Sequence, residues 1–172
     1  MICDGLSRVP AFAFLGLLVA GAAWDLWRYL IPNSICAALA GLFALWAALA
    51  PGQVDWLSHV GAGLAALAGG GVLFRFGKLG GGDVKFLAAA ALWAGFEHLW
   101  PLLVYTALAG GVLALGLVAA RRAIGAVPGW AGSDAHIRPR FLRIGEAVPY
   151  GAAIAGAALY LSPRLPVLQG AF

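Results

Sequence analysis

The chain has 172 residues, of which 63% are apolar and 10% are charged, and its mean hydropathy is +0.91. Soluble domains carry about 45–50% apolar and about 25% charged residues, so this chain has too few polar side chains to cover a surface in water. The composition excludes a disordered chain and a fibrous repeat, and the length suits a single domain. We therefore expect an all-α, polytopic membrane protein with one transmembrane domain over residues 1–172.

Apolar runs, taken in chain order, predict about six transmembrane helices in one bundle. A spanning helix needs about 20 apolar residues, and shorter ones occur where helices are recessed. The expected spans are 9–24, 35–50, 57–74, 84–96, 99–120 and 147–161. The fourth and fifth come from one apolar stretch that is too long to cross a membrane once as a straight helix. We expect that stretch to turn near Glu97–Pro101.

The basic residues predict an orientation for this bundle. Nine of the eleven Lys and Arg residues fall in the first, third and fifth loops: Arg28, Arg75, Lys78, Lys85, Arg121, Arg122, Arg138, Arg140 and Arg143. By the positive-inside rule these loops face the cytoplasm. We therefore expect a multi-pass inner-membrane protein with both termini outside. We expect the cytoplasmic loop 121–146 either to anchor the chain to anionic lipid or to form a gate or docking surface near an active site.

Candidate catalytic groups are few because polar side chains are few. The chain contains no GxSxG, HExxH or GxxxxGK[ST] motif. Its histidines, His59, His98 and His136, fall in different segments, which does not favour a metal site. We therefore expect no metal and no cofactor.

Two carboxylates stand out by their positions. Asp25 follows sixteen uncharged residues at the cytoplasmic end of the first expected helix, and Asp83 lies at the matching edge of the fourth. An ionised carboxylate within the hydrocarbon costs about 2.5–3.5 kcal/mol, so such residues usually have a function. Taken alone, Asp25 could pair with Arg28, and Asp83 could simply be an acid at a helix N-terminus. As neighbours, the two could share one proton, so that one carboxyl activates water while the other protonates a peptide carbonyl.

Gly80, Gly81 and Gly82 directly precede Asp83. Glycines leave room for another backbone, and a protease must bind its substrate in an extended form, so the triplet suits a substrate-binding loop. A flexible connection between helices would explain it equally well. Two placements are open for Lys85, which could pair with Asp83 or extend to the membrane interface.

Three segments of the chain resemble the motifs of type IV prepilin peptidases. The segment Trp24–Asn33 (WDLWRYLIPN) resembles the first active-site motif, Gly80–Lys85 (GGGDVK) resembles the GxGD motif, and Pro149–Gly151 resembles a third signature. The three occur in family order. The resemblance implies a GxGD-type aspartic peptidase in which Asp25 and Asp83 form the catalytic pair. It also implies an active-site loop and substrate-binding region at Gly80, Gly81, Gly82, Pro149, Tyr150 and Gly151.

The same resemblance implies a membrane-embedded endopeptidase that removes the short basic leader of prepilins at the cytoplasmic face, usually after a glycine. The chain is most similar to the short branch that serves Flp-type tight-adherence pili. Longer members also methylate the new N-terminus through an additional N-terminal region, and with eight residues before the first expected span we expect no methyltransferase activity. The expected partners are prepilin or pseudopilin leader peptides and the lipid bilayer, with no nucleic acid. Monomer and homo-oligomer both stay open.

Two other functions compete with this hypothesis. A proton-coupled carrier would use the same carboxylates to bind and release protons, but carriers usually place such charges near the bilayer midplane. A non-catalytic membrane partner of a pilus-assembly machine would not need the carboxyl groups at all.

Overall fold

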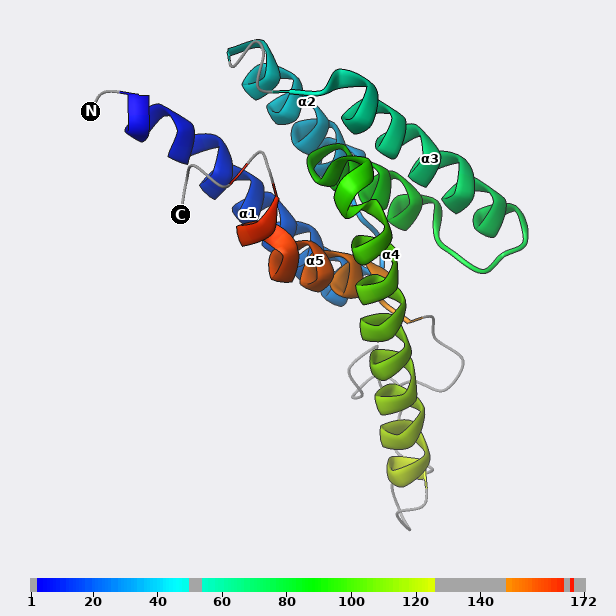
Figure 1. The fold of residues 1–172 in the computed structure, drawn as a ribbon. Coiled ribbons are helices and arrows are strands. Elements are labelled where there is room, and N and C mark those ends of the chain that lie inside the picture. Colours follow the sequence, from blue (N-terminus) through cyan, green and yellow to red (C-terminus); the bar gives the residue numbers. More distant parts are fainter. Residues whose placement is uncertain (1–2, 50–53, 126–147, 166–167, 169–172) are drawn as a thin grey trace.

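The computed structural model describes residues 3–49, 54–125, 148–165 and 168, with side chains from residue 9 onward. The described residues form helices and no strands: α1 (Cys3–Arg28), α2 (Asn33–Leu49), α3 (Trp56–Arg75), α4 (Gly81–Gly125), α5 (Tyr150–Leu161) and the short η2 (Ser162–Arg164) (Figure 1). The all-α expectation is confirmed. Apart from its first residues, which belong to α4, the expected loop 121–146 lies outside the described part of the chain.

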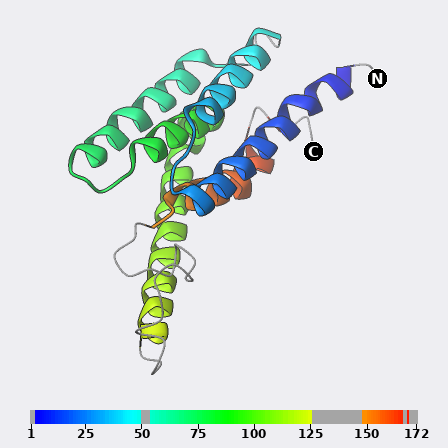
Figure 2. The ribbon, with the colours of Figure 1, turned by 180° about the vertical axis from the view of Figure 1, so that it is seen from behind.

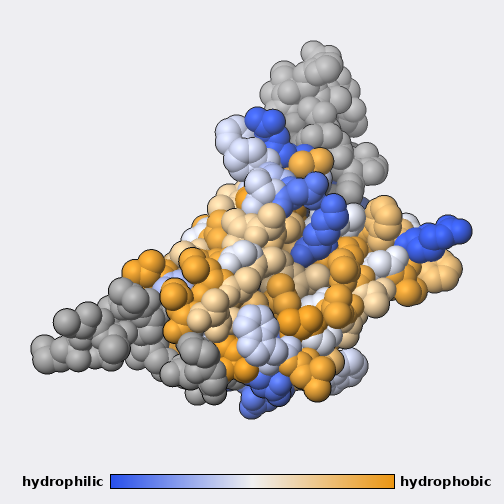
Figure 3. Space-filling model, turned by 90° about the horizontal axis from the view of Figure 1, so that it is seen from above, coloured by the Kyte–Doolittle hydropathy of each residue, from blue (hydrophilic) through white to orange (hydrophobic). Residues whose placement is uncertain are grey.

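Three of the helices are long and apolar enough to cross a membrane, over Val9–Arg28, Trp56–Arg75 and Gly81–Ile124. The helix α2 is apolar but shorter. Apolar side chains cover most of the face seen in Figure 3, and hydrophilic ones lie mainly toward its margins. These features are those of a membrane protein, while the count of six spans stays a prediction.

Large aromatic side chains at the centre of the molecule hold α1, α2 and α4 together. Trp93 of α4 is completely buried, stacks on Phe14 of α1 with 4.5 Å between ring centroids, and meets Phe43 of α2 edge-on at 5.7 Å. Its indole Nε1 donates a 3.1 Å hydrogen bond to the backbone oxygen of Leu39. Glycines let the helices approach closely, as at Gly70 of α3, where an added Cβ would lie 3.0 Å from Val84 of α4.

The long helix α4 is interrupted at Gly95, whose φ of 64° and ψ of 177° are not helical. The interruption therefore falls at Gly95 and not at Glu97–Pro101, where we expected a turn, and Pro101 lies inside the helix. The physical reason is that this pair of dihedral angles is accessible essentially to glycine alone, whereas the polar residues and the proline only suggested a break.

The interruption divides α4 into two parts with different neighbours. The first part packs beside α2 and α3, and the second part continues past α5, which lies alongside α1 (Figures 1 and 2). The end of α1, the start of α4 and the start of α5 consequently meet in one region of the protein.

Candidate active site

Asp25 lies in the last turn of α1 and is 4% exposed, so its carboxyl group is buried in the protein. Its Oδ2 atom accepts a 2.8 Å hydrogen bond from the backbone N–H of Gly151, in the first turn of α5. The free N–H groups at a helix N-terminus stabilise negative charge. The partner that the structure gives to Asp25 is therefore the start of α5, and not the Arg28 side chain considered from the sequence. The Arg28 guanidinium lies instead over the rings of Trp24 and Trp27.

Asp83 lies in the first turn of α4 and is half-buried. The turn is closed by a 3.1 Å hydrogen bond from the N–H of Val84 to the oxygen of Gly80. The Asp83 carboxyl group bends back over Gly80, where an added Cβ would lie 2.8 Å from Oδ2.

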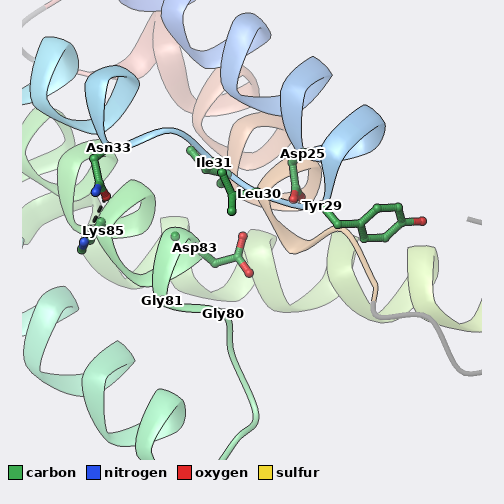
Figure 4. A pocket seen from close by; sticks show the side chains of 10 residues that line it. Asp25, Tyr29, Leu30, Ile31, Asn33, Gly80, Gly81, Asp83 and Lys85 are labelled. Carbon is green, nitrogen blue, oxygen red and sulfur yellow. Dashed lines mark hydrogen bonds between the residues drawn. The ribbon is translucent and has the colours of Figure 1, made fainter. Parts of the chain in front are cut away.

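Both acids line one cavity of about 430 Å³. Its lining residues are Asp25, Tyr29, Leu30, Ile31, Asn33, Gly80, Gly81, Gly82, Asp83 and Lys85. Figure 4 shows the two carboxyl groups facing the same space beside the connection between α1 and α2. The structure thus brings together two acids that are far apart in the sequence. A cavity of this size admits water and a segment of peptide.

The three glycines expected in the active-site loop all line this cavity, but their surroundings differ. A Cβ on Gly80 would crowd Asp83, and one on Gly82 would lie 3.4 Å from three atoms of Ile31, two of them backbone. A Cβ on Gly81 would meet only the ring of Phe74, also at 3.4 Å. Glycine is therefore required most strongly at the position that faces the Asp83 carboxylate.

None of the three residues of the third expected motif, Pro149–Gly151, lines the cavity, but Gly151 contacts one of the two acids that do. Gly151 contacts Asp25, and an added Cβ there would lie 2.8 Å from Oδ2 and 2.6 Å from Cδ1 of Ile31. Pro149 is fully buried at the N-cap of α5. The Tyr150 ring packs against Gly110 in the second part of α4, where an added Cβ would lie 2.8 Å from Cε1. Pro149 and Tyr150 do not line the cavity and instead position the first turn of α5.

Several cavity residues were not proposed as site residues from the sequence. Tyr29 follows α1 with a φ of 54°, which is uncommon for a residue other than glycine, and nothing in its sequence context signals this. Asn33 was part of the first motif, and its Oδ1 accepts a 3.0 Å hydrogen bond from Nζ of Lys85. Lys85 thereby joins the start of α2 to the start of α4, and its expected extension to the membrane interface stays a prediction.

The two carboxyl groups of the cavity suit acid–base chemistry. Among the described residues there is no group of three or more His, Cys, Asp or Glu side chains that could hold a metal ion. Two neighbouring carboxyl groups are able to hold a single proton between them, and one can accept a proton from water while the other donates one.

The fold and cavity define a helical membrane protein with paired acids at one end of the bundle. Comparison with known families identifies the family of the protein. The model of the type IV leader peptidase family matches residues 12–115, and the chain belongs to that family. The matched segment includes both Asp25 and Asp83. No curated protein and no solved structure matches the chain. Membership implies a peptidase that acts on the leaders of prepilins.

Proposed function

We propose that the chain is an aspartic endopeptidase in which Asp25 and Asp83 form the catalytic pair. The observation that carries this proposal is that both carboxyl groups, from helices distant in sequence, line the same cavity. Family membership supports leader-peptidase activity in general, and the paired acids supply the chemistry for it.

The reaction needs one ionised and one protonated carboxyl group. The ionised member takes a proton from water as the water oxygen attacks the carbonyl carbon of the scissile bond. The protonated member donates its proton to the carbonyl oxygen, which gives a tetrahedral intermediate. When the C–N bond breaks, the carboxyl group that took the proton from water gives it to the leaving nitrogen. A hydroxyl of the intermediate returns its proton to the other carboxylate as the carbonyl re-forms, so that one proton again remains between the two acids.

The substrate that we propose is the basic leader of a prepilin or pseudopilin, such as those that build type IV or Flp pili. A leader must lie extended for its peptide bond to reach the two acids. The glycines Gly80–Gly82 line the cavity and leave room for a second backbone. The basic side chain of Lys85, which donates a hydrogen bond to Asn33, also lines the cavity.

We infer that the site faces the cytoplasm of a bacterial inner membrane. Arg28 ends α1, Arg75 ends α3, and Lys78 and Lys85 flank the start of α4, all at the end of the bundle that carries the cavity. Basic loops stay on the cytoplasmic side. In a chain with Cys3→Ser and Cys36→Ala, a cysteine introduced at Lys78 is expected to resist a membrane-impermeant thiol reagent added to intact cells and to react after the cells are opened. Reaction in intact cells would place the site on the periplasmic side.

The activity is tested by incubating the purified protein in detergent with a purified prepilin and measuring the mass of the product. We expect loss of the leader with the unaltered protein and no detectable cleavage by Asp25→Asn or Asp83→Asn. The matched control is Asp55→Asn, which makes the same change at an acid outside the cavity, and asparagine can still cap α3 there. Cleavage retained in either cavity variant would exclude the pair as the catalytic groups.

A further inference from the structure

The interruption of α4 at Gly95 removes a hydrogen bond that a continuous α-helix would contain. In such a helix the N–H of Phe96 would donate to the oxygen of Leu92, four residues earlier. In the structure the Phe96 N–H donates instead to Oγ of Ser58, at 3.0 Å. The Leu92 oxygen lies 2.7 Å from Nδ1 of His59, which therefore carries the proton and donates it. Two adjacent residues of α3 thus replace both partners of the missing bond.

We call Ser58 and His59 the clasp. Both lie in the first turn of α3, where the Asp55 side chain accepts hydrogen bonds from the N–H groups of Leu57 and Ser58 at 3.1 and 3.2 Å. The His59 ring is 5% exposed and lies against Phe43 with 5.3 Å between centroids. The helix cap and the aromatic packing therefore hold Oγ of Ser58 and Nδ1 of His59 in position against α4.

Gly95 and the clasp fit each other closely. An added Cβ on Gly95 would lie 3.2 Å from Cε1 of His59 and 3.2 Å from Oγ of Ser58. The unusual backbone at Gly95 and the two polar side chains therefore form one unit. Its effect is to fix the direction in which the second part of α4 leaves the first.

That direction matters for the candidate active site, because the two parts of α4 hold different pieces of it. The first part carries Asp83 and packs against α3 through Gly63 and Gly70. The second part packs against α5, where the Tyr150 ring lies on Gly110. Gly151, which follows Tyr150 in α5, donates the hydrogen bond to Asp25. The bend consequently sets how the start of α5 lies relative to Asp83.

We propose that Ser58 and His59 are positioning residues for the peptidase reaction. Acting about 18 Å along α4 from Asp83, they hold the bend that brings Asp83 to Asp25 and Gly151. This inference rests on the proposed function, since it assigns the clasp a role in the geometry of that catalytic pair.

The kinetic test compares variants that remove a polar atom with variants that keep it. Ser58→Ala and His59→Leu remove the acceptor and the donor, whereas Ser58→Thr keeps the hydroxyl and His59→Asn keeps an N–H group near the position of Nδ1. We expect the first two to lower kcat for leader removal by about 10-fold to 100-fold, with KM changed by no more than about twofold. The second two are expected to recover most of the lost kcat. The control Ser162→Ala removes a buried hydroxyl that, among the described residues, donates to the Leu159 oxygen in its own turn, and should keep the unaltered kcat.

A second measurement reports the bend itself without using activity. Spin labels at Val72 of α3 and Val112 in the second part of α4, both exposed, are introduced into a chain with Cys3→Ser and Cys36→Ala. We expect the distribution of distances between the labels to broaden or shift in Ser58→Ala and His59→Leu, and to return in Ser58→Thr and His59→Asn. Should either disruptive variant fail to insert, Phe43→Leu loosens the support of His59 and is expected to show a smaller effect in both measurements.

The outcomes separate this inference from the proposed function. An unaltered kcat in Ser58→Ala and His59→Leu, beside inactive Asp25→Asn and Asp83→Asn, would overturn the role of the clasp and leave the catalytic pair standing. An unchanged distance distribution with a lowered kcat would also overturn it, because the clasp would then not act through the bend. Absence of cleavage by the unaltered protein would overturn the proposed function and this inference with it.

Discussion

The backbone N–H of Gly151 donates a 2.8 Å hydrogen bond to Oδ2 of Asp25, although 126 positions separate the two residues in the chain. This bond connects the end of α1 to the start of α5. It also leaves no room for a larger residue, because an added Cβ on Gly151 would lie 3.0 Å from Cγ of Asp25. The bond therefore explains physically why glycine is needed there, at the end of the third motif.

Replacing Gly151 by alanine is expected to lower kcat for leader removal by about 100-fold, because the new methyl group displaces the Asp25 carboxyl from its position in the cavity. The matched control is Gly156→Ala in the same helix, where nothing lies within 4 Å of an added Cβ. The control is expected to keep its activity. Equal kcat values for the two alanine variants would contradict the placement of Asp25 against α5.

The glycines before Asp83 are expected to differ in their tolerance of alanine. Gly80→Ala should lower kcat by about 10-fold or more, because its methyl group pushes on the Asp83 carboxyl, whereas Gly81→Ala meets only the Phe74 ring and should lose less. Steady-state kinetics on both variants with the same prepilin measures this difference. A larger loss for Gly81→Ala would show that the triplet acts as a flexible connection and not by making room beside Asp83.

The hydrogen bond between Lys85 and Asn33 is expected to couple the start of α4 to the start of α2. In a double-mutant cycle with Lys85→Met and Asn33→Ala, unfolding in detergent should give a coupling free energy of about 0.5–1 kcal/mol, because the bond is exposed to solvent. A parallel cycle that pairs Lys78→Met with Asn33→Ala should give none. Coupling of the same size in both cycles would indicate a general effect of positive charge.

Trp93 is expected to be among the most important residues for stability. Trp93→Ala should lower the free energy of unfolding by about 3–5 kcal/mol, because it removes a fully buried ring and the hydrogen bond to Leu39. Trp100, which is 71% exposed, provides the matched control, and its replacement by alanine should change stability by less than about 1 kcal/mol. Similar losses in the two variants would contradict the central position of the Trp93 cluster.

The sequence was most informative where local composition has a direct structural meaning. Apolar runs indicated the helices, and the rarity of acids in such runs singled out Asp25 and Asp83. Motif order added Gly151 to the same site. The positions of Pro149 and Tyr150 could not be predicted in the same way. A sequence motif does not distinguish a residue that supports the start of a helix from the core from one that lines a cavity.

The sequence was least informative where the structure depends on hydrogen bonds between helices. His59 could be considered only as a metal ligand, because its bond to the Leu92 oxygen depends on the approach of two helices. The position of the break at Gly95 was likewise not predicted, because the partner of the freed Phe96 N–H is Ser58, on another helix. The positive φ of Tyr29 has no local signal, because nothing in its sequence context requires the left-handed conformation.

The most direct measurement compares kcat for leader removal in Asp25→Asn, Asp83→Asn and the variant that carries both changes. Groups that act as a unit give non-additive losses, so the account predicts that each single change reduces cleavage to the same residual level as the double change. Losses that multiply in the double variant, or substantial cleavage by either single variant, would contradict a shared catalytic pair.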